Sequence, residues 1–91
     1  MYKLESTAGF RKLYKKVSKH IKFNKVIFDE IVEKLLQGEE LDTKYKNHKL
    51  KGGMYGMSEC HLAPDLLLVY RIDDDVLTLT LVKIGSHSEI F

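Results

Sequence analysis

The sequence predicts an α+β fold in which a helical hairpin packs on one face of an antiparallel four-stranded sheet, in the order β-α-α-β-β-β. Two segments of the first half repeat apolar residues at helical spacing, whereas the second half holds strand-like apolar runs separated by short turns. Strands that follow one another through short turns pair antiparallel. A chain of 91 residues has interior for one core, so we expect a single domain over residues 1–91.

The first half is expected to hold an edge strand and two amphipathic helices. Residues 2–4 indicate the strand, and Ser6 or Thr7 offers an oxygen that caps the first helix. The buried stripe of that helix is Phe10, Leu13, Tyr14, Val17 and Ile21. Asn24 caps the second helix and Gly38 ends it. Its apolar set faces the same core and comprises Ile27, Phe28, Ile31, Val32, Leu35 and Leu36.

The second half indicates a glycine-containing loop followed by three strands. Residues 39–56 have no periodicity, and their glycines favour a mobile surface loop. Strands are expected at 57–62, 66–72 and 76–83, with turns at 63–65 and 73–75. The middle strand is apolar on both faces, as in a central strand, whereas residues 76–83 alternate as in a half-buried one.

The charge is unevenly distributed along the chain. The net charge is +2, but residues 1–51 hold thirteen Lys/Arg against seven Asp/Glu, and residues 52–91 hold two against six. A basic half suggests a polyanionic partner, above all a nucleic acid, although lysine-rich helix faces are as often only solvated surface. The basic run in the first helix contains Arg11, Lys12, Lys15, Lys16 and Lys19.

Other features concern location. The longest apolar run has five residues, whereas a membrane-spanning helix needs about twenty, so no contact with a membrane is expected. Cys60 is the single cysteine and cannot form an internal disulfide, and the first residues do not resemble a secretion signal. We therefore expect a cytoplasmic protein.

Three histidines outside the helices are candidates for acid–base chemistry. His48 lies in the basic loop, His61 at a strand end and His87 after the last strand, where a sheet can bring them together. Asp65, across the turn from His61, can orient an imidazole or take a proton itself. A single histidine is more often structural, and His20 among the helix lysines is an example.

A metal site, a cysteine nucleophile and a phosphate-binding loop are weaker interpretations. Cys60 and His61 are neighbours in a strand and point to opposite faces, so they cannot share an ion or act as a nucleophile and its base. No C-x-x-C motif is present, and the glycines do not match a nucleotide-binding loop. Cys60 is expected to be a small buried filler, and no metal or cofactor is expected.

RNA cleavage suits this set of residues because RNA carries its own nucleophile. A base takes the proton of the 2′-hydroxyl, the oxygen attacks the adjacent phosphorus, an acid protonates the leaving 5′-oxygen and a cation holds the phosphate charge. The histidines and Asp65 can supply the acid and base, and Lys51 or Arg71 the cation.

Three motifs make the chain resemble a known family. They are His48-Lys49-Leu50-Lys51-Gly52, the segment 60–70 that begins Cys60-His61-Leu62-Ala63-Pro64-Asp65, and the segment Ile84-Gly85-Ser86-His87-Ser88-Glu89-Ile90-Phe91. Together they resemble the YafQ-like branch of the RelE/ParE toxins of bacterial toxin–antitoxin pairs. The resemblance spans nearly the whole chain.

The resemblance implies a bacterial toxin that enters the ribosomal A site, cuts mRNA without a metal and is silenced by an antitoxin. It implies that His48, His61, Asp65 and His87 are catalytic and that Phe91 contacts an RNA base. We assign His87 as the general acid, and leave the base or its orienting partner among the other three. The basic first helix then binds ribosomal RNA, and DNA is contacted only through the antitoxin complex.

Two departures and two alternatives accompany this interpretation. Met54 stands where relatives have Trp, and Ser58 where they have Arg, so activity is expected to be weaker unless Arg71 compensates. One alternative is a non-catalytic RNA- or ribosome-binding module of the same fold. Another is the gyrase-inhibiting branch of the superfamily, against which the histidine set argues.

Overall fold

One mixed sheet of five strands, in the order β1-β5-β4-β3-β2, forms the centre of the molecule. The computed structural model describes all 91 residues. Helices α1 (Ala8–Val17) and α2 (Lys25–Leu36) lie between the first two strands, and α3 (His87–Ile90) follows the last. The strands are β1 (Lys3–Ser6), β2 (His48–Lys49), β3 (Ser58–Ala63), β4 (Leu66–Asp73) and β5 (Thr78–Gly85). Two single 3₁₀ turns cover Thr43–Tyr45 and Gly52–Met54.

The α+β class is confirmed, but the four-stranded antiparallel sheet is wrong in two respects. β1 pairs in parallel with β5, and because both helices and three strands separate the two in the chain, no short turn forces them to run antiparallel. β2 adds a fifth strand, antiparallel to β3, inside the segment expected to be a loop. Two residues are too few to show an alternating pattern, so the sequence gives no signal for β2.

The helix caps follow the sequence closely, but α1 is shorter than its apolar stripe. The Thr7 hydroxyl accepts from the Phe10 amide, and the Asn24 side chain accepts from two amides at the start of α2. α1 ends at Val17, and Ile21, expected in its buried stripe, is 95% exposed. Phe23 packs on the core in its place.

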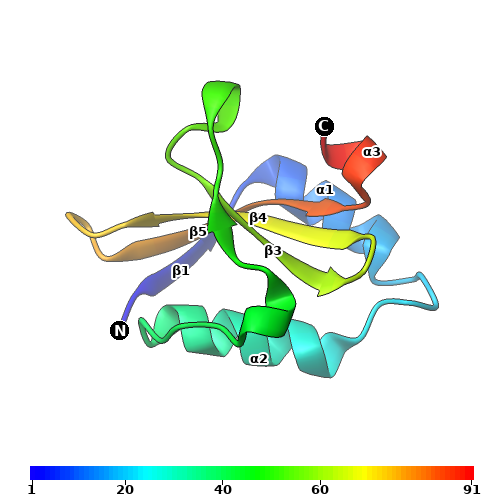
Figure 1. The fold of residues 1–91 in the computed structure, drawn as a ribbon, viewed down its shortest axis with the longest axis horizontal. Coiled ribbons are helices and arrows are strands. Elements are labelled where there is room, and N and C mark those ends of the chain that lie inside the picture. Colours follow the sequence, from blue (N-terminus) through cyan, green and yellow to red (C-terminus); the bar gives the residue numbers. More distant parts are fainter.

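The sheet has one face covered by helices and one covered by a small cluster. The larger core joins α1, α2 and the sheet, and its aromatic rings Phe10, Tyr14, Phe23 and Phe28 pack against one another in stacked and tilted pairs. On the opposite face, Leu67, Val69 and Ile90 form the smaller cluster. In Figure 1, α2 runs below the sheet and α3 stands above it with the C-terminus.

β4 is the central strand, as the sequence predicts, and Cys60 is fully buried in the larger core. The last strand begins two residues later than expected. Val76 and Leu77 lie in the turn before β5, and Leu77 has a positive φ of 46°. Both side chains are exposed, so Leu77 does not share the buried face of Leu79 and Leu81. None of the helices has the length and apolar character needed to cross a membrane.

Candidate active site

The candidate catalytic residues lie on and around the face of the sheet that the long helices leave uncovered. Cys60 and Leu62 point into the helix-side core, so Glu59 and His61 point to the opposite face. His48 on β2 pairs with Glu59 on β3. His61 is therefore the diagonal neighbour of His48, a placement in which the two residues lie about 7–8 Å apart and their Cβ atoms somewhat closer.

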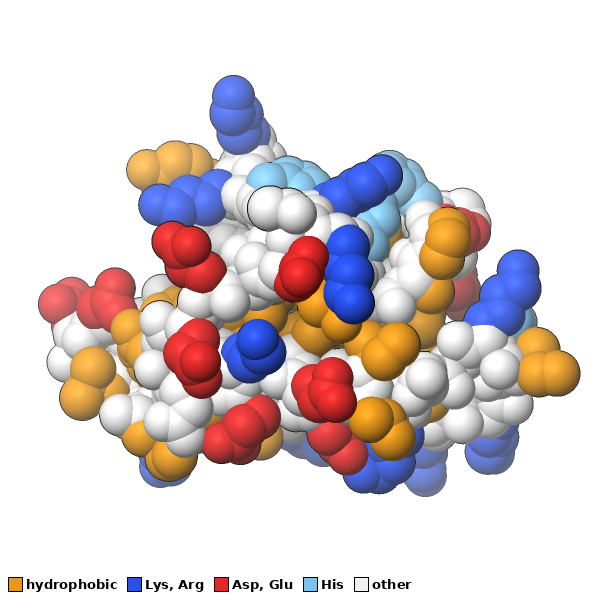
Figure 2. Space-filling view, turned by 60° about the horizontal axis from the view of Figure 1, so that its bottom comes forward, with side chains coloured by type: hydrophobic (Ala, Val, Ile, Leu, Met, Phe, Trp, Pro, Cys, Tyr) orange, Lys and Arg blue, Asp and Glu red, His pale blue; other side chains and the backbone are white.

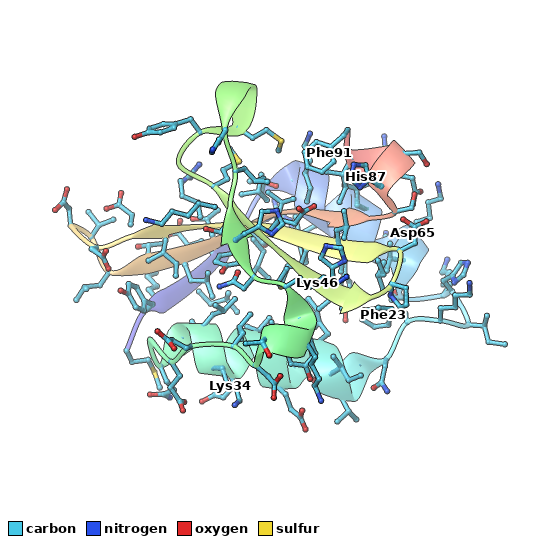
Figure 3. All side chains as sticks on the ribbon, viewed as in Figure 1. Phe23, Lys34, Lys46, Asp65, His87 and Phe91 are labelled. Atoms are coloured by element: carbon cyan, nitrogen blue, oxygen red, sulfur yellow. The ribbon has the colours of Figure 1, made fainter.

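The other end of this face is formed by the β3–β4 turn and α3. His61 pairs with Leu67, and Leu67 pairs with Gly85, two residues before His87. Oδ1 of Asp65 accepts a hydrogen bond from the backbone N–H of His87, 3.2 Å away. Figure 3 shows Asp65 and His87 facing each other across this end of the sheet. The expected orienting role of Asp65 thus falls on the backbone of His87.

The aromatic ring of Phe91 stands beside the imidazole of His87. Their ring centroids are 5.1 Å apart, because Phe91 directly follows α3 and lies one helical turn after His87. Phe91 is about half exposed. Figure 3 places both side chains on the same side of α3 as the sheet face. A half-exposed aromatic ring next to an acid–base group is suited to stack on a nucleobase.

Glu89 holds α3 in place. Its carboxylate accepts from the backbone N–H of Ser86 at 2.9 Å and from Nζ of Lys16 at 2.7 Å. The Lys16 ammonium, followed by the Ser86 amide, lowers the pKa of Glu89 to about 2. The carboxylate therefore stays ionised at neutral pH and ties α3 to α1. A cavity of about 590 Å³ separates the end of α1 from the β3–β4 turn and α3.

His48 is anchored by its neighbours in the chain and by β3. Its Nδ1 atom lies 2.8 Å from the backbone carbonyl of Lys46, and its Nε2 atom 2.9 Å from Oε2 of Glu59. The adjacent Asn47 accepts a hydrogen bond from the Tyr70 hydroxyl. Burial raises the pKa of Tyr70 to about 12, so the hydroxyl keeps its proton and the anchor persists at neutral pH.

Lys51 and Arg71, the two residues expected to hold the phosphate charge, lie in different parts of the structure. Lys51 is exposed and precedes the 3₁₀ turn Gly52–Met54, three residues after His48. Arg71 lies four residues along β4 from Leu67, about 13 Å at the rise of a strand. It borders a groove with Lys3 and Glu5 at the β1 side of the sheet. The register therefore separates Arg71 from His61, whereas Arg71 lies only two residues along β4 from Val69, the partner of Glu59.

The basic residues of α1 divide into engaged and free side chains. Arg11 donates to the Ser6 backbone carbonyl, and Lys16 pairs with Glu89. Lys12, Lys15 and Lys19 are exposed and form no ion pair. In Figure 2, histidine side chains gather at the upper edge beside basic ones, further basic side chains line the lower edge, and acidic side chains spread mainly over the middle.

Two positions of this face were not singled out from the sequence. Glu59, the buried partner of His48, has no motif of its own and becomes visible only through the β2–β3 register. Lys83 pairs with Val69 and is half-buried, so it brings a cation to the strand that leads to His87. A register in which β5 runs next to β4 is the signal that could have found it.

The two departures from the family pattern have structural explanations. Met54 packs against the smaller cluster through the glycine loop, as a larger apolar ring would. Ser58 has the strand parity of Cys60, so its side chain points to the helix side, the side on which its strand partner Tyr70 is buried. The expected weakening of activity from Ser58 and Met54 stays a prediction.

The cysteine does not enter this face. Burial raises the pKa of the Cys60 thiol to about 12, so the thiolate nucleophile is not formed at neutral pH. No group of three or more His, Cys, Asp or Glu side chains lies close enough together to hold a metal ion.

The fold and its histidine-bearing face define a class: small bacterial toxins of type II toxin–antitoxin systems. The chain belongs to the YafQ family of these toxins, because the family model for the bacterial toxin of the type II toxin–antitoxin system, YafQ, matches residues 2–91. The resemblance seen in the sequence is thereby confirmed.

Similar proteins come from two bacterial species. The mRNA interferase toxin YafQ of Escherichia coli strain K12 is 33% identical over 51 residues, which are 56% of this chain and 53% of that protein. The match thus spans about half the length of the curated relative. A metal-bound toxin from Helicobacter pylori is 44% identical over the whole of both chains, with a TM-score of 0.92. In the E. coli DinJ-YafQ toxin-antitoxin complex, the match is 25% identical, covers 99% and 97% of the chains and has a TM-score of 0.86.

Proposed function

We propose that this toxin is a ribosome-dependent endoribonuclease that cuts mRNA and so inhibits translation. The observation that supports the proposal most strongly is the set of three histidines and one aspartate around one face of the sheet. The E. coli relative is named an mRNA interferase, which supports the same activity. A bacterial toxin that acts on ribosome-bound mRNA works in the cytoplasm.

The proposed reaction uses the RNA's own 2′-hydroxyl as the nucleophile. A base removes the 2′-hydroxyl proton, the 2′-oxygen forms a bond to the adjacent phosphorus, and the bond from phosphorus to the 5′-oxygen breaks. An acid gives its proton to the departing 5′-oxygen. The products are a 2′,3′-cyclic phosphate and a 5′-hydroxyl, and no water or electron is consumed.

The residues are proposed to share these steps. His87 is the general acid, because it lies on the exposed helix beside Phe91, which positions a base of the RNA. The general base or its orienting partner is His48, His61 or Asp65. Lys51, near His48, is proposed to contact the phosphate. Arg71 would do so only for RNA that extends to the β1 side of the sheet.

The partners are the ribosome with its mRNA and an antitoxin. The free lysines Lys12, Lys15 and Lys19 are proposed to bind ribosomal RNA, because they are exposed without acidic partners, the first two on α1 and Lys19 in the turn that follows it. Arg11 and Lys16 of the same helix would exchange their internal contacts for RNA phosphates. A protein antitoxin is supported by the DinJ-YafQ complex.

We propose chemistry without a metal, although one similar toxin has been crystallised with metal bound. Proton transfer by the histidines and Asp65 is sufficient for the reaction. The side chains that could ligate a metal do not form a cluster of three or more. A chelator test distinguishes the two chemistries. Cleavage that disappears in chelator and returns with added metal would contradict this part of the proposal.

The experiment that tests the function compares His87→Gln with the unaltered toxin in a translating extract. His20→Gln is the matched control, because His20 is an exposed histidine outside the proposed site. We expect His87→Gln to lose about 100-fold or more of the cleavage rate with ribosome binding retained, and His20→Gln to cleave normally. Ribosome binding by the unaltered toxin without any cleavage would instead favour a non-catalytic binding module.

A further inference from the structure

A buried carboxylate stands directly behind His48. Only 5% of Glu59 is exposed, and its one ion-pair contact is with the imidazole of His48. Its Oε2 atom lies 2.9 Å from Nε2 of His48, and its Oε1 atom is buried without a hydrogen-bond partner. A half-satisfied buried carboxylate disfavours folding unless it is paired with a charge. Its place in the sheet therefore points to a role in the site.

The imidazole of His48 is held from two sides by acceptors. Nδ1 lies 2.8 Å from the Lys46 carbonyl, which can only accept, and Nε2 faces the Glu59 carboxylate. A neutral imidazole donates from one nitrogen, whereas an imidazolium donates from both. With an ionised Glu59, both contacts are hydrogen bonds only for the doubly protonated ring. A ring held in this way has no free lone pair with which to accept a proton from RNA.

We propose that Glu59 is a positioning residue that fixes His48 as a doubly protonated cation facing the RNA phosphate. This inference rests on the proposed function, since it gives His48 a part in the same cleavage. The His48 side chain is 51% exposed and accessible to RNA, whereas the Glu59 side chain is not. The base role then falls to His61 or Asp65.

The surrounding structure supports a fixed position for this ring. The Tyr70 hydroxyl anchors Asn47, the residue before His48, and Leu50, two residues after it, packs on the smaller cluster. The segment around His48 is thus attached to the sheet on both sides. A cation held rigidly near the reacting phosphate stabilises its charge without reorganisation during the reaction.

The first measurement determines the protonation of the His48 ring, beginning with the unaltered toxin. In the full-length toxin labelled with ¹⁵N-histidine, we expect both ring nitrogens of His48 to show the signature of protonated nitrogen at pH 7. In Glu59→Gln, which keeps the side-chain shape, we expect one ring nitrogen of His48 to become unprotonated. Glu30→Gln is the matched control, because Glu30 is an exposed acid on α2, and it should leave the His48 signals unchanged.

The second measurement is cleavage of ribosome-bound mRNA by the same proteins. Glu59→Gln should lower the cleavage rate about 10- to 100-fold. It should not lower the melting temperature, because the substitution removes both the buried charge and the free energy needed to take that charge out of water. His48→Lys keeps a cation but no imidazole, and should cleave faster than His48→Gln. A purely structural Glu59 would instead change the melting temperature and leave the rate intact.

The outcomes separate the two proposals. A neutral His48 ring in the unaltered toxin, or unchanged cleavage in Glu59→Gln, overturns the role of Glu59 and leaves the nuclease proposal standing. His48→Lys that is as inactive as His48→Gln overturns the cation role as well. Absence of ribosome-dependent cleavage by the unaltered toxin overturns both proposals together.

Discussion

Removal of the Glu89 side chain should loosen α3 and with it His87, the proposed general acid. In Glu89→Ala, the Ser86 amide loses its acceptor at 2.9 Å and Lys16 loses its partner at 2.7 Å. The cap contributes about 1 kcal/mol, and the ion pair, whose lysine is largely exposed, at most about 1 kcal/mol. We therefore expect a loss of about 1–2 kcal/mol in the free energy of unfolding.

The effect on catalysis should exceed the effect on folding. A helix of four residues is not stable by itself, so α3 depends on this cap and on the buried Ile90. We expect cleavage to fall at least about tenfold because His87 is no longer held in place.

Urea unfolding and single-turnover cleavage on programmed ribosomes measure these two quantities. Glu89→Gln separates the contributions, because its amide oxygen still accepts from the Ser86 amide while the charge is lost. It should keep most of the cleavage rate. Stability and cleavage that are both unchanged in Glu89→Ala would refute the argument, since Ile90 alone would then hold the helix.

Four further predictions follow from other parts of the structure. The lowered pKa of Glu89 means that its stabilising contribution is complete above about pH 4.5 and is lost as the pH falls toward 2; acid unfolding of Glu89→Gln should lack this part of the curve. Tyr70→Phe should cost about 1 kcal/mol in urea unfolding, because the part-buried hydrogen bond to Asn47 is lost; an unchanged midpoint would show that the anchor is unimportant. Arg71→Ala should keep most of the cleavage rate, because Arg71 lies four residues along β4 from Leu67, the partner of His61; near-complete loss would place the RNA over the β1 side. Replacement of the free lysines of α1 and of the turn after it by alanine should weaken ribosome binding and flatten its salt dependence, as a filter-binding titration would show; the residues are Lys12, Lys15 and Lys19.

The periodic elements of the fold could be predicted from the sequence, and the short ones could not. The stripe from Phe10 to Val17 and the caps Thr7 and Asn24 predict the helices because their signals are local. Ile21 fits the same helical spacing but lies beyond the end of α1, where the chain is no longer helical and the spacing does not predict which side chains are buried. β2 and the parallel pairing of β1 depend on contacts between distant parts of the chain, which periodicity does not report.

The candidate site shows the same division. The resemblance to a family identifies His61, Asp65 and His87, and the structure places Asp65 against the His87 backbone. The motif gives no information on Glu59, because its importance comes from the residue opposite it on β2. Arg71 was chosen for its charge, and its distance along β4 follows only from the register.

The most direct test of the nuclease proposal is a primer-extension map of a defined mRNA incubated with the purified toxin in excess chelator, with and without translating ribosomes. The account predicts cuts that occur only with ribosomes, persist in chelator and disappear with His87→Gln. Cuts that require a metal would contradict the proposed chemistry. Ribosome binding without any cut would contradict the nuclease itself.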